Sequence, residues 1–381
     1  MISFQPTEEE LAFIEIARDL ARQKIRPLIH EKKEITDKYD RVILQMKELG
    51  ILQLELPEKW GGLELPLVTQ VQILQELAYG DLDFVQSLPG AGDAASLFRI
   101  LPENERSKEL REKFLTEEMN TVAYIDIDRS YHSVKTSLHL GVENLRPILN
   151  GKTPPVRLGE TCNLLIIGLS DSTGNKQLCY VDDPGEYKIP VDNRLGLNHA
   201  NVAAFHFEEV EIPPEQVIAS GKEAEIILAQ ARARIQILQA AKEIGLARAA
   251  LDYATEYTAT RKAFGRHIAQ FQGVSFQIAE MAIEIQAANH LLLVAAVTGD
   301  QNISQALPLA LRGLNRAHRA LRFATDRAVQ LLGGHGYIRE FPVEKWMRDA
   351  QAQVLLYGRE KELLHEYGEW LVNNHKEVAR L

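Results

Sequence analysis

The C-terminal part of the sequence constrains the fold most, because its pattern is helical almost throughout. Four long segments cover about 224–260, 269–297, 304–332 and 342–374, and only short breaks separate them. Long helices joined by short connections pack antiparallel, with their apolar stripes facing one another. The pattern therefore predicts an antiparallel four-helix bundle at this end of the chain.

Two different patterns precede the bundle. Near the N-terminus, Thr7 and Glu10 have the spacing of a helix capping box, and apolar residues then recur at helical intervals. Beyond about residue 115 the apolar runs shorten, as in 163–168 and 203–212, and turn-rich pieces separate them. Such runs are typical of antiparallel strands rather than of βαβ units. We therefore predict an α+β chain with an N-terminal helical domain (1–115), a middle antiparallel β-domain (116–225) and a C-terminal four-helix bundle (226–381).

Composition narrows the class of protein. A net charge of -10 argues against a nucleic-acid-binding protein, because such proteins neutralise phosphates with Lys and Arg. No uninterrupted apolar run approaches the roughly 18 residues of a membrane span, and the first residues lack the pattern of a secretory signal. We therefore expect a cytoplasmic protein without a membrane span. Cys162 and Cys179 form no CxxC motif and lie beside no clustered histidines, so we expect neither a disulfide framework nor a metal site.

Two junctions between the predicted bundle helices carry residues suited to binding a cofactor. The first places Arg261, Phe264 and Gln272 within twelve residues of sequence. A planar guanidinium suits two phosphate oxygens, and an aromatic side chain and an amide suit a ring-bearing ligand. The second junction, 330–337, is rich in glycines, which lack a Cβ and let a ligand approach the backbone. Together they predict a grip for a phosphorylated, ring-bearing cofactor.

Structural roles for the same residues are the alternative. Arg261 would then be a solvated cation at a helix C-terminus, and Gly265 would end that helix. Phe264 and Tyr337 would be packing aromatics. The residues of each junction taken alone leave both interpretations open.

Further motifs extend the pattern over the whole chain. They are Pro57–Gly62, Leu149–Gly151, Val210–Pro213, Arg261–Gln272, Gln330–Tyr337 and Arg348–Ala350. In this order and spacing they resemble the motifs of the acyl-CoA dehydrogenase family. The resemblance implies an oxidoreductase that binds FAD at the subunit interface of a tetramer, acts on an acyl thioester of CoA or of a carrier protein, and passes electrons to an electron-transfer acceptor.

The resemblance also implies a mechanism and assigns roles to the two junctions. A family glutamate removes the weakly acidic α-proton of the thioester while hydride leaves the β-carbon for the flavin. Arg261 matches the arginine that meets the pyrophosphate of a neighbouring subunit's FAD, Phe264 the aromatic beside the flavin's linker, and Gln272 an amide in the following helix. The turn around the adenosine is matched by Gln330, Gly333 and Gly334.

The family's catalytic base is missing from its usual places. Tyr357 stands where the largest branch has its glutamate. In a second branch the base directly precedes an arginine, and these two positions are Ile235 and Gln236 here. Tyrosine, with an ordinary pKa of about 10, is a poor general base at neutral pH. Glu243 lies about two helical turns, roughly 12 Å, beyond Ile235, and a charge at a helix contact or on the surface is its alternative role. Glu243 and Tyr357 are the two candidates for a non-standard base.

The residues expected around the flavin ring differ as well. The segment Tyr124–Arg129 corresponds to the family's Thr-Glu-Pro and the Gly-Ser-Asp loop that cradles the ring. The segment Pro154–Arg157 corresponds to the Trp-Ile-Thr that stacks on the ring and hydrogen-bonds it. We therefore predict that the isoalloxazine pocket has lost its floor.

The differences from the family pattern fall on one side of the FAD site. Residues that would bind a neighbour's FAD are kept, whereas residues that would bind the chain's own flavin ring or act as its base are replaced. The hypothesis that follows is a non-catalytic partner subunit, which completes a paralogue's FAD site in a mixed, two-plus-two tetramer. The alternatives are a self-sufficient homotetrameric dehydrogenase with a non-standard base, a flavin monooxygenase side branch, and a flavin-free structural homologue.

Overall fold

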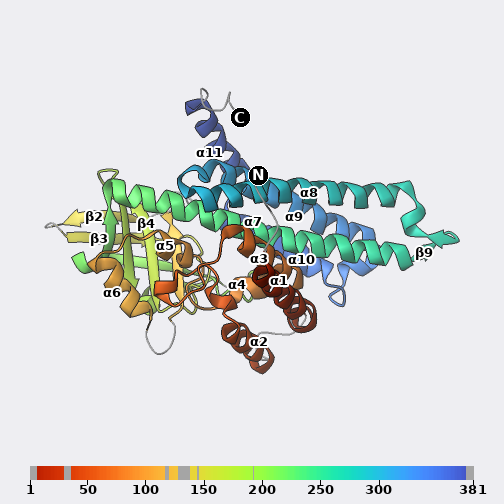
Figure 1. Cartoon of the computed structure of the whole chain (residues 1–381), viewed down its shortest axis with the longest axis horizontal. Helices are drawn as coiled ribbons and strands as arrows, with labels where there is room; N and C mark the ends of the chain where they lie inside the picture. The colour runs from red at the N-terminus through yellow and green to blue at the C-terminus, as the bar shows by residue number, and fades with distance from the viewer. Residues whose placement is uncertain are drawn as a thin grey trace.

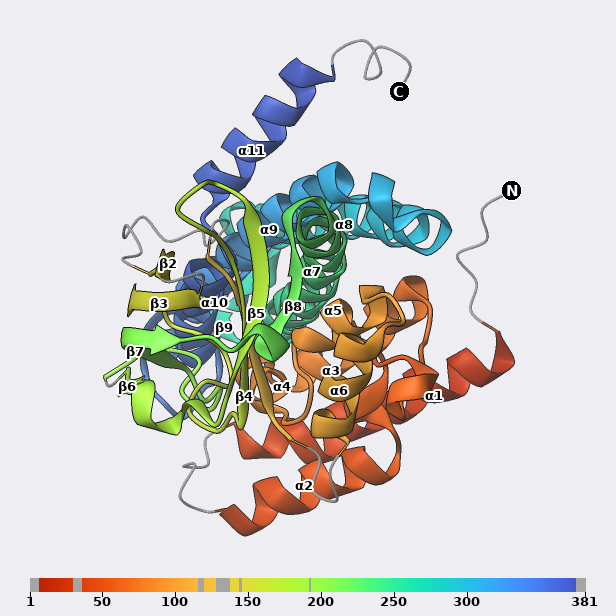
Figure 2. The same cartoon turned by 90° about the vertical axis from the view of Figure 1, so that its left-hand side faces the viewer.

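The structure, a computed structural model, describes residues 7–29, 36–115, 120–127, 138–143, 146–191 and 193–374. Its longest helices run along the long axis of the molecule (Figure 1). The β-sheets lie at one end of this axis and a small hairpin lies at the other. Figure 2 shows the N-terminal helices and the sheets on either side of the long helix α7.

The N-terminal part is helical, as predicted. The capping box is confirmed, because the Thr7 amide donates to Glu10 Oε2 (2.7 Å) and the Glu10 amide donates to Thr7 Oγ1 (3.3 Å). The α-helices in the described residues of this part are α1 (Glu8–Leu20), α2 (Thr36–Glu48), α3 (Leu67–Gly80), α4 (Leu82–Ser87), α5 (Ala94–Ile100) and α6 (Glu105–Phe114).

The middle part contains two four-stranded sheets among its described residues. One sheet has the strand order β1-β4-β5-β8 and the other the order β2-β3-β7-β6. Their bounds are β1 (Val122–Asp126), β2 (His139–Glu143), β3 (Arg146–Lys152), β4 (Leu164–Ser170), β5 (Lys176–Asp182), β6 (Lys188–Pro190), β7 (Ala203–Glu211) and β8 (Val217–Ser220). Apolar side chains of both sheets, including Ile167, Phe205 and Phe207, pack into one core.

Pairing in these sheets differs from the prediction at one place. Strands β1 and β4 are parallel, with Val122 opposite Leu164, whereas the other described pairs are antiparallel. A parallel pair needs a long crossover connection, and strands β2 and β3 of the second sheet lie within the connection from β1 to β4.

The C-terminal helices are α7 (Gly221–Thr260), α8 (Gln272–Gln301), α9 (Leu307–Leu332), α10 (Val343–Tyr357) and α11 (Glu360–Asn373). The prediction of one helix over 342–374 is wrong at Gly358, whose φ of +108° is a conformation that favours glycine and ends α10. Helix α11 projects away from the body of the molecule (Figures 1 and 2). Helix α7 packs closely against α3 of the N-terminal part at Gly245, where a Cβ would lie only 2.3 Å from the Gln75 carbonyl oxygen.

One helix among the described residues, α8, is long and apolar enough to cross a membrane by length and composition alone. Core helices of soluble proteins pass the same test. Met281, Ile285, Ala288 and Leu292 of α8 are buried in the same core cluster as side chains of α7 and α9. One apolar face of α8 therefore packs within the chain, whereas Phe276, Ile283 and Val294 of the same helix are 60%, 63% and 44% exposed.

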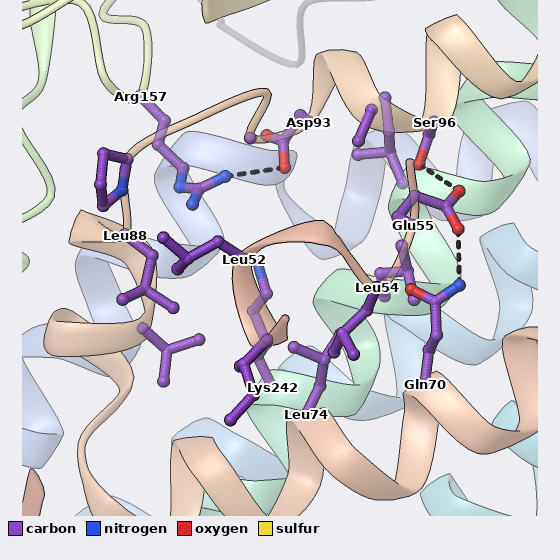
Figure 3. Close-up of a pocket in the computed structure, with 17 residues that line it drawn as sticks. Leu52, Leu54, Glu55, Gln70, Leu74, Leu88, Asp93, Ser96, Arg157 and Lys242 are labelled. Atoms are coloured by element: carbon purple, nitrogen blue, oxygen red, sulfur yellow. Dashed lines mark hydrogen bonds and ion pairs between the residues drawn. The ribbon is translucent and has the colours of Figure 1, made fainter. Parts of the chain in front are cut away.

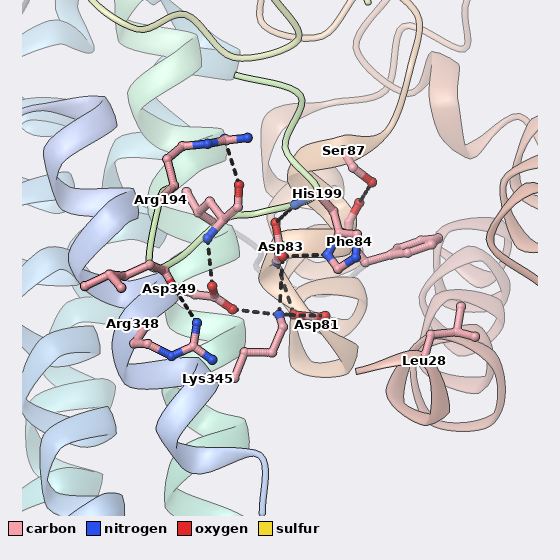
Figure 4. A network of polar contacts seen from close by, with 12 residues as sticks. Leu28, Asp81, Asp83, Phe84, Ser87, Arg194, His199, Lys345, Arg348 and Asp349 are labelled. Carbon is pink, nitrogen blue, oxygen red and sulfur yellow. Dashed lines mark hydrogen bonds and ion pairs between the residues drawn. The ribbon is translucent and has the colours of Figure 1, made fainter. Parts of the chain in front are cut away.

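A buried ionic network ties α10 to the N-terminal part (Figure 4). Lys345 Nζ lies 2.9 Å from Asp81 Oδ1, 3.5 Å from Asp83 Oδ2 and 2.7 Å from Asp349 Oδ2. His199, from the loop before β7, donates its backbone amide to Asp83 Oδ1 (2.9 Å). Burial lowers the pKa of Lys345, but the surrounding aspartates outweigh it and hold that pKa well above its ordinary value. The network fixes the first turns of α10, and the candidate base Tyr357 is the last residue of the same helix.

Candidate active site

The first cofactor junction forms a tight hairpin beyond the end of α7. Strands β9 (Lys262–Ala263) and β10 (Arg266–His267) pair antiparallel, and Phe264 and Gly265 form the two-residue loop with φ of +52° and +80°. Such loops need positive φ at both positions, which is strained for a residue other than glycine. The Phe264 side chain is nevertheless 95% exposed. Strain on an exposed aromatic that packs into no core indicates a binding role for this tip.

Other side chains of the hairpin make the tip cationic and aromatic. The Arg266 guanidinium lies 3.9 Å from the centroid of the Phe271 ring, and the Phe264 ring meets Phe271 edge-on at 6.3 Å. Arg261 at the end of α7 and Gln272 at the start of α8 are both exposed. Phosphate oxygens and a planar ring can therefore reach this surface.

The second junction lies at the same end of the long helices. Gln330, Gly333 and Gly334 are exposed where α9 ends, and the short helix η10 (Gly333–Tyr337) follows. His335 Nδ1 lies 2.6 Å from the Tyr257 hydroxyl, which belongs to the last turn of α7. The structure thus brings both predicted groups of cofactor residues to one end of the helices.

Gly333 and Gly334 of this tip are not required by close packing within the chain, although the φ of +58° at Gly333 favours glycine; a Cβ at Gly336, by contrast, would lie 2.2 Å from the Val329 carbonyl oxygen. A Cβ built at Gly333 or Gly334 would meet no described atom within 4 Å. Open backbone is suited to a ligand or a second subunit that approaches from outside. The exposed half of the predicted site therefore fits the adenosine and pyrophosphate half of FAD.

Tyr357, the first candidate base, lies in the interior, far along the long helices from the tip. Its hydroxyl donates to Asp93 Oδ2 (2.7 Å). Burial and then the negative charge of Asp93 raise the pKa of Tyr357 well above its ordinary value. The hydroxyl is therefore held protonated as a hydrogen-bond donor, which is the opposite of what a general base needs.

Arg157 ends the segment that the resemblance aligns with the residues that stack on the flavin, and its contact with Asp93 is drawn in Figure 3. Its Nη1 donates to Asp93 Oδ1 (3.1 Å) and its Nε donates to the Gln86 carbonyl oxygen (2.7 Å). Gln239 of α7 donates a further hydrogen bond to Asp93 Oδ1 (2.8 Å). The Arg157 side chain is only 7% exposed, so a buried ion pair occupies this position.

Glu243, the second candidate base, is fully buried on α7. Its Oε2 lies 2.7 Å from His318 Nδ1 of α9, and its Oε1 accepts from Gln353 Nε2 of α10 at 3.2 Å. Of the two alternatives for this residue, a charge at a helix contact agrees with the structure and a surface charge does not. Both carboxylate oxygens are engaged in holding α7, α9 and α10 together.

A small cavity lies beside these residues (Figure 3). It measures about 90 Å³, whereas pockets that enclose ligands of drug size usually measure about 300–1,000 Å³. It is lined by Ile51, Leu52, Leu54, Glu55, Gln70, Leu74, Val85, Leu88, Pro89, Gly92, Asp93, Ala95, Ser96, Arg157, Ile235, Leu238 and Lys242. Ile235, at a position where the resemblance allows a base, offers only an aliphatic side chain.

The described residues of this interior half differ from those that the resemblance implies around a flavin ring. Arg157 and Tyr357, which the resemblance aligns with the ring-stacking residues and with the base, both contact Asp93. Two residues of the predicted ring cradle, Asp128 and Arg129, lie outside the described residues. Elsewhere in the described ranges, no group of three or more His, Cys, Asp or Glu side chains could hold a metal ion.

Comparison with known proteins gives the family. A family model described as "Acyl-CoA dehydrogenase, N-terminal domain" matches residues 7–120, and one described as "Acyl-CoA dehydrogenase, C-terminal domain" matches residues 228–366. The chain belongs to the acyl-CoA dehydrogenase family. Among curated relatives, an acyl-CoA dehydrogenase of Bacillus subtilis is 28% identical over 382 residues, covering 92% of this chain and 95% of the relative. The cyclohex-1-ene-1-carbonyl-CoA dehydrogenase of Geobacter metallireducens is 27% identical, covering 92% and 95%.

Solved structures share the acyl-CoA dehydrogenase fold over the whole chain. Butyryl-CoA dehydrogenase from Megasphaera elsdenii has a TM-score of 0.83 at 24% identity and covers 97% of this chain and 100% of its own. An FAD complex of PigA has a TM-score of 0.84 at 17% identity and covers 97% and 99%. At these identities the likeness concerns the fold, and the predicted architecture of helical, β and helical parts is confirmed.

Sequence reasoning missed several residues of the interior in this family member. Lys242, Asp93 and Gln86 were not predicted from the sequence. Lys242 and Asp93 line the cavity. The Gln86 amide accepts a hydrogen bond from Lys242 and donates one from its Nε2 to Gln353 Oε1 (2.7 Å). For Lys242 a signal exists, since it follows Ile235 and Leu238 at spacings of seven and four on one face of α7. For Asp93 and Gln86 the sequence carries no comparable signal.

Proposed function

We propose that this chain is the non-catalytic subunit of a mixed acyl-thioester dehydrogenase, in which it completes the FAD site of a paralogous catalytic subunit. Membership of the acyl-CoA dehydrogenase family supports an acyl thioester of CoA or of a carrier protein as the substrate of the complex. It also supports FAD as the cofactor and an electron-transfer acceptor as the redox partner. The proposed complex contains two copies of each subunit.

One contrast within the molecule carries this proposal. The residues that would hold the outer half of FAD are exposed at the tip, and the residues that would hold its flavin ring are replaced by the buried contacts of Arg157, Asp93 and Tyr357. A subunit of a homotetramer would need both halves, the interior half for its own flavin ring and the tip for its neighbour's FAD. A subunit that serves a neighbour's flavin needs only the exposed tip.

The tip residues would act by binding and orientation. Arg261 would hold the pyrophosphate through two parallel hydrogen bonds to its oxygens, which suits a guanidinium. Phe264, fixed in its exposed position by the hairpin, would pack beside the linker to the flavin, and Gln272 would donate an amide hydrogen bond. The adenosine would lie against the open backbone of Gly333 and Gly334. When bound, the flavin accepts a hydride from the β-carbon of the acyl group.

The base for the α-proton would come from the paralogue. Tyr357 holds its own proton, because its pKa is raised by burial and by Asp93. Glu243 is committed to His318 and Gln353 and does not line the cavity. In this interior half, neither candidate combines a free carboxylate with a position beside a space that could hold a thioester.

The proposal is tested by the flavin content of the purified chain, alone and co-expressed with paralogous dehydrogenases of the same genome. We expect a colourless chain when it is purified alone and a yellow complex with one paralogue, whose absorbance is bleached by an acyl thioester. Arg261→Ala in this chain should weaken FAD binding by the complex about 10- to 100-fold, since a charge-assisted hydrogen bond contributes roughly 1.5–3 kcal/mol. Lys222→Ala, another exposed cation on α7, is the matched control.

Other outcomes identify the alternatives. A chain that is yellow when purified alone and is bleached by an acyl thioester is a self-sufficient dehydrogenase. Oxygen consumption driven by reduced flavin identifies a monooxygenase, and a chain that stays colourless with every paralogue is a flavin-free homologue. Each of these results contradicts the proposed partner role.

A further inference from the structure

The interior cavity is lined by a lysine, Lys242, that has no part in the proposed partner role. Aliphatic side chains of the N-terminal part and of α7 form most of its wall, and its polar lining side chains are Arg157, Asp93, Lys242, Glu55, Gln70 and Ser96 (Figure 3). Leu52 and Pro89, which also line it, are partly exposed, so the cavity reaches the surface at this edge. A small molecule can therefore enter without passing the tip.

Lys242 is the reactive group of this cavity. Its Nζ donates to Gln86 Oε1 at 3.1 Å, which leaves two of the three ammonium donors outside this bond. It forms no ion pair with a carboxylate in the ranges that the structure describes. The nearest acids are already committed, since Asp93 binds Arg157 and Glu243 binds His318.

Burial and then the positive charge of Arg157 lower the pKa of Lys242 to about 7, although Asp93 and Glu243 oppose the shift. An exposed lysine has a pKa of about 10.4 and is almost wholly protonated at neutral pH. The Lys242 amine therefore holds a free lone pair at neutral pH to an extent that surface lysines do not. A desolvated lysine near a second cation is a known route to a nucleophilic amine.

We propose that Lys242 is a covalent binding site for a short aliphatic aldehyde, which it captures as an imine. The lone pair of Nζ attacks the carbonyl carbon, and a carbon–nitrogen bond forms. The carbonyl oxygen then leaves as water with the two hydrogens of the amine. The step is a condensation without change of oxidation state and needs no cofactor.

The cavity decides the class of aldehyde. Its volume of about 90 Å³ is small beside the roughly 300–1,000 Å³ of pockets for drug-sized ligands, which favours a short ligand. Leu54, Leu74 and Leu238 in the wall favour an alkyl chain over a polar one. Because the Arg157 guanidinium is already paired with Asp93, a carboxylate on the ligand would lie near the negative charge of Asp93.

The test is reductive trapping with butanal and cyanoborohydride on the full-length chain at neutral pH, followed by peptide mapping. We expect the mass of one butyl group on Lys242, gained at least ten-fold faster than on Lys222. Lys222 lies on the same helix with its side chain 77% exposed. The neutral fraction of an amine with a pKa of about 7 is about a thousand-fold larger than that of an ordinary lysine at this pH.

Two variants and one second probe sharpen the result. Lys242→Arg keeps a cation but removes the nucleophile, and should abolish the label at this position, whereas Lys222→Arg should leave the label on Lys242 unchanged. The aldehyde 4-oxobutanoate, which is butanal with a terminal carboxylate, should label Lys242 more slowly than butanal. Two results would overturn the proposal: Lys242 is labelled no faster than Lys222, or Lys242 is preferred equally in the urea-unfolded chain. Both are measured on the wild-type protein.

Discussion

The ion pair between Asp93 and Arg157 gives the sharpest prediction about the interior half of the site. Asp93→Asn keeps the shape of the side chain but removes the charge that balances Arg157. Both side chains are largely buried, at 14% and 7% exposure. Asparagine also turns one acceptor into a donor, so the hydrogen bonds that Asp93 now accepts from Tyr357 and Gln239 cannot all remain.

The expected loss is large for a single substitution. Removing one partner of a buried ion pair costs about 3–5 kcal/mol of unfolding free energy, because the other charge stays buried without a counter-ion. We therefore expect Asp93→Asn to lower the unfolding free energy by about 3 kcal/mol. Urea unfolding followed by tryptophan fluorescence measures this change, since Trp60 and Trp346 are both buried.

Two further variants separate the ion pair from general damage. Glu225→Gln breaks an exposed pair with Lys222 and should change stability by less than about 0.5 kcal/mol. The double variant Asp93→Asn with Arg157→Met should cost less than the sum of the single variants by about 1–3 kcal/mol, because both remove the same interaction. An Asp93→Asn variant as stable as the wild type, or costs that simply add, would refute the idea that a buried ion pair fills this position.

Three other predictions concern the buried groups. Lys345→Met should lower the unfolding free energy by about 3–5 kcal/mol in the same urea assay, because it leaves a cluster of buried aspartates without their cation. Lys242→Met should change the pH dependence of stability. The unfolded chain binds the Lys242 proton more tightly than the folded chain does. The unfolding free energy of the wild type relative to the variant should therefore rise by on the order of 4 kcal/mol between pH 7 and about 10.4. A difference that stays constant across this pH range in urea unfolding would contradict the lowered pKa. Tyr357→Phe should leave the rate of acyl-thioester oxidation by the mixed complex unchanged within about two-fold, whereas loss of activity with flavin retained would identify Tyr357 as a catalytic residue.

The exposed half of the site could be predicted from sequence because its residues lie close together along the chain. Arg261, Phe264 and Gln272 fall within one turn between two helices, and antiparallel packing of long helices brings the end of α9 to the same place. Short-range spacing and helix periodicity are sufficient to bring these residues together, whereas their role in binding a cofactor rests on the family resemblance and stays a prediction.

The interior half could be predicted only by what was missing from it. The absence of the usual base at Tyr357 was readable, but the partner of its hydroxyl, Asp93, is 264 residues away. Glu243 and His318 are likewise 75 residues apart. Contacts between distant segments depend on tertiary packing, which no local pattern encodes. The hydrogen bond of Lys242 to Gln86, 156 residues away, could therefore not be predicted, although the helical face of Lys242 could.

The most direct test of the partner role is the number of FAD molecules per mixed tetramer, measured from flavin absorbance and protein mass on the purified complex. Two FAD molecules for four chains are expected, because the tips of this chain complete the two sites of the paralogue while its own interior halves stay closed by Arg157 and Asp93. Four FAD molecules per tetramer, with an interior flavin retained after Arg261→Ala, would contradict the proposed division of the site between the two subunits.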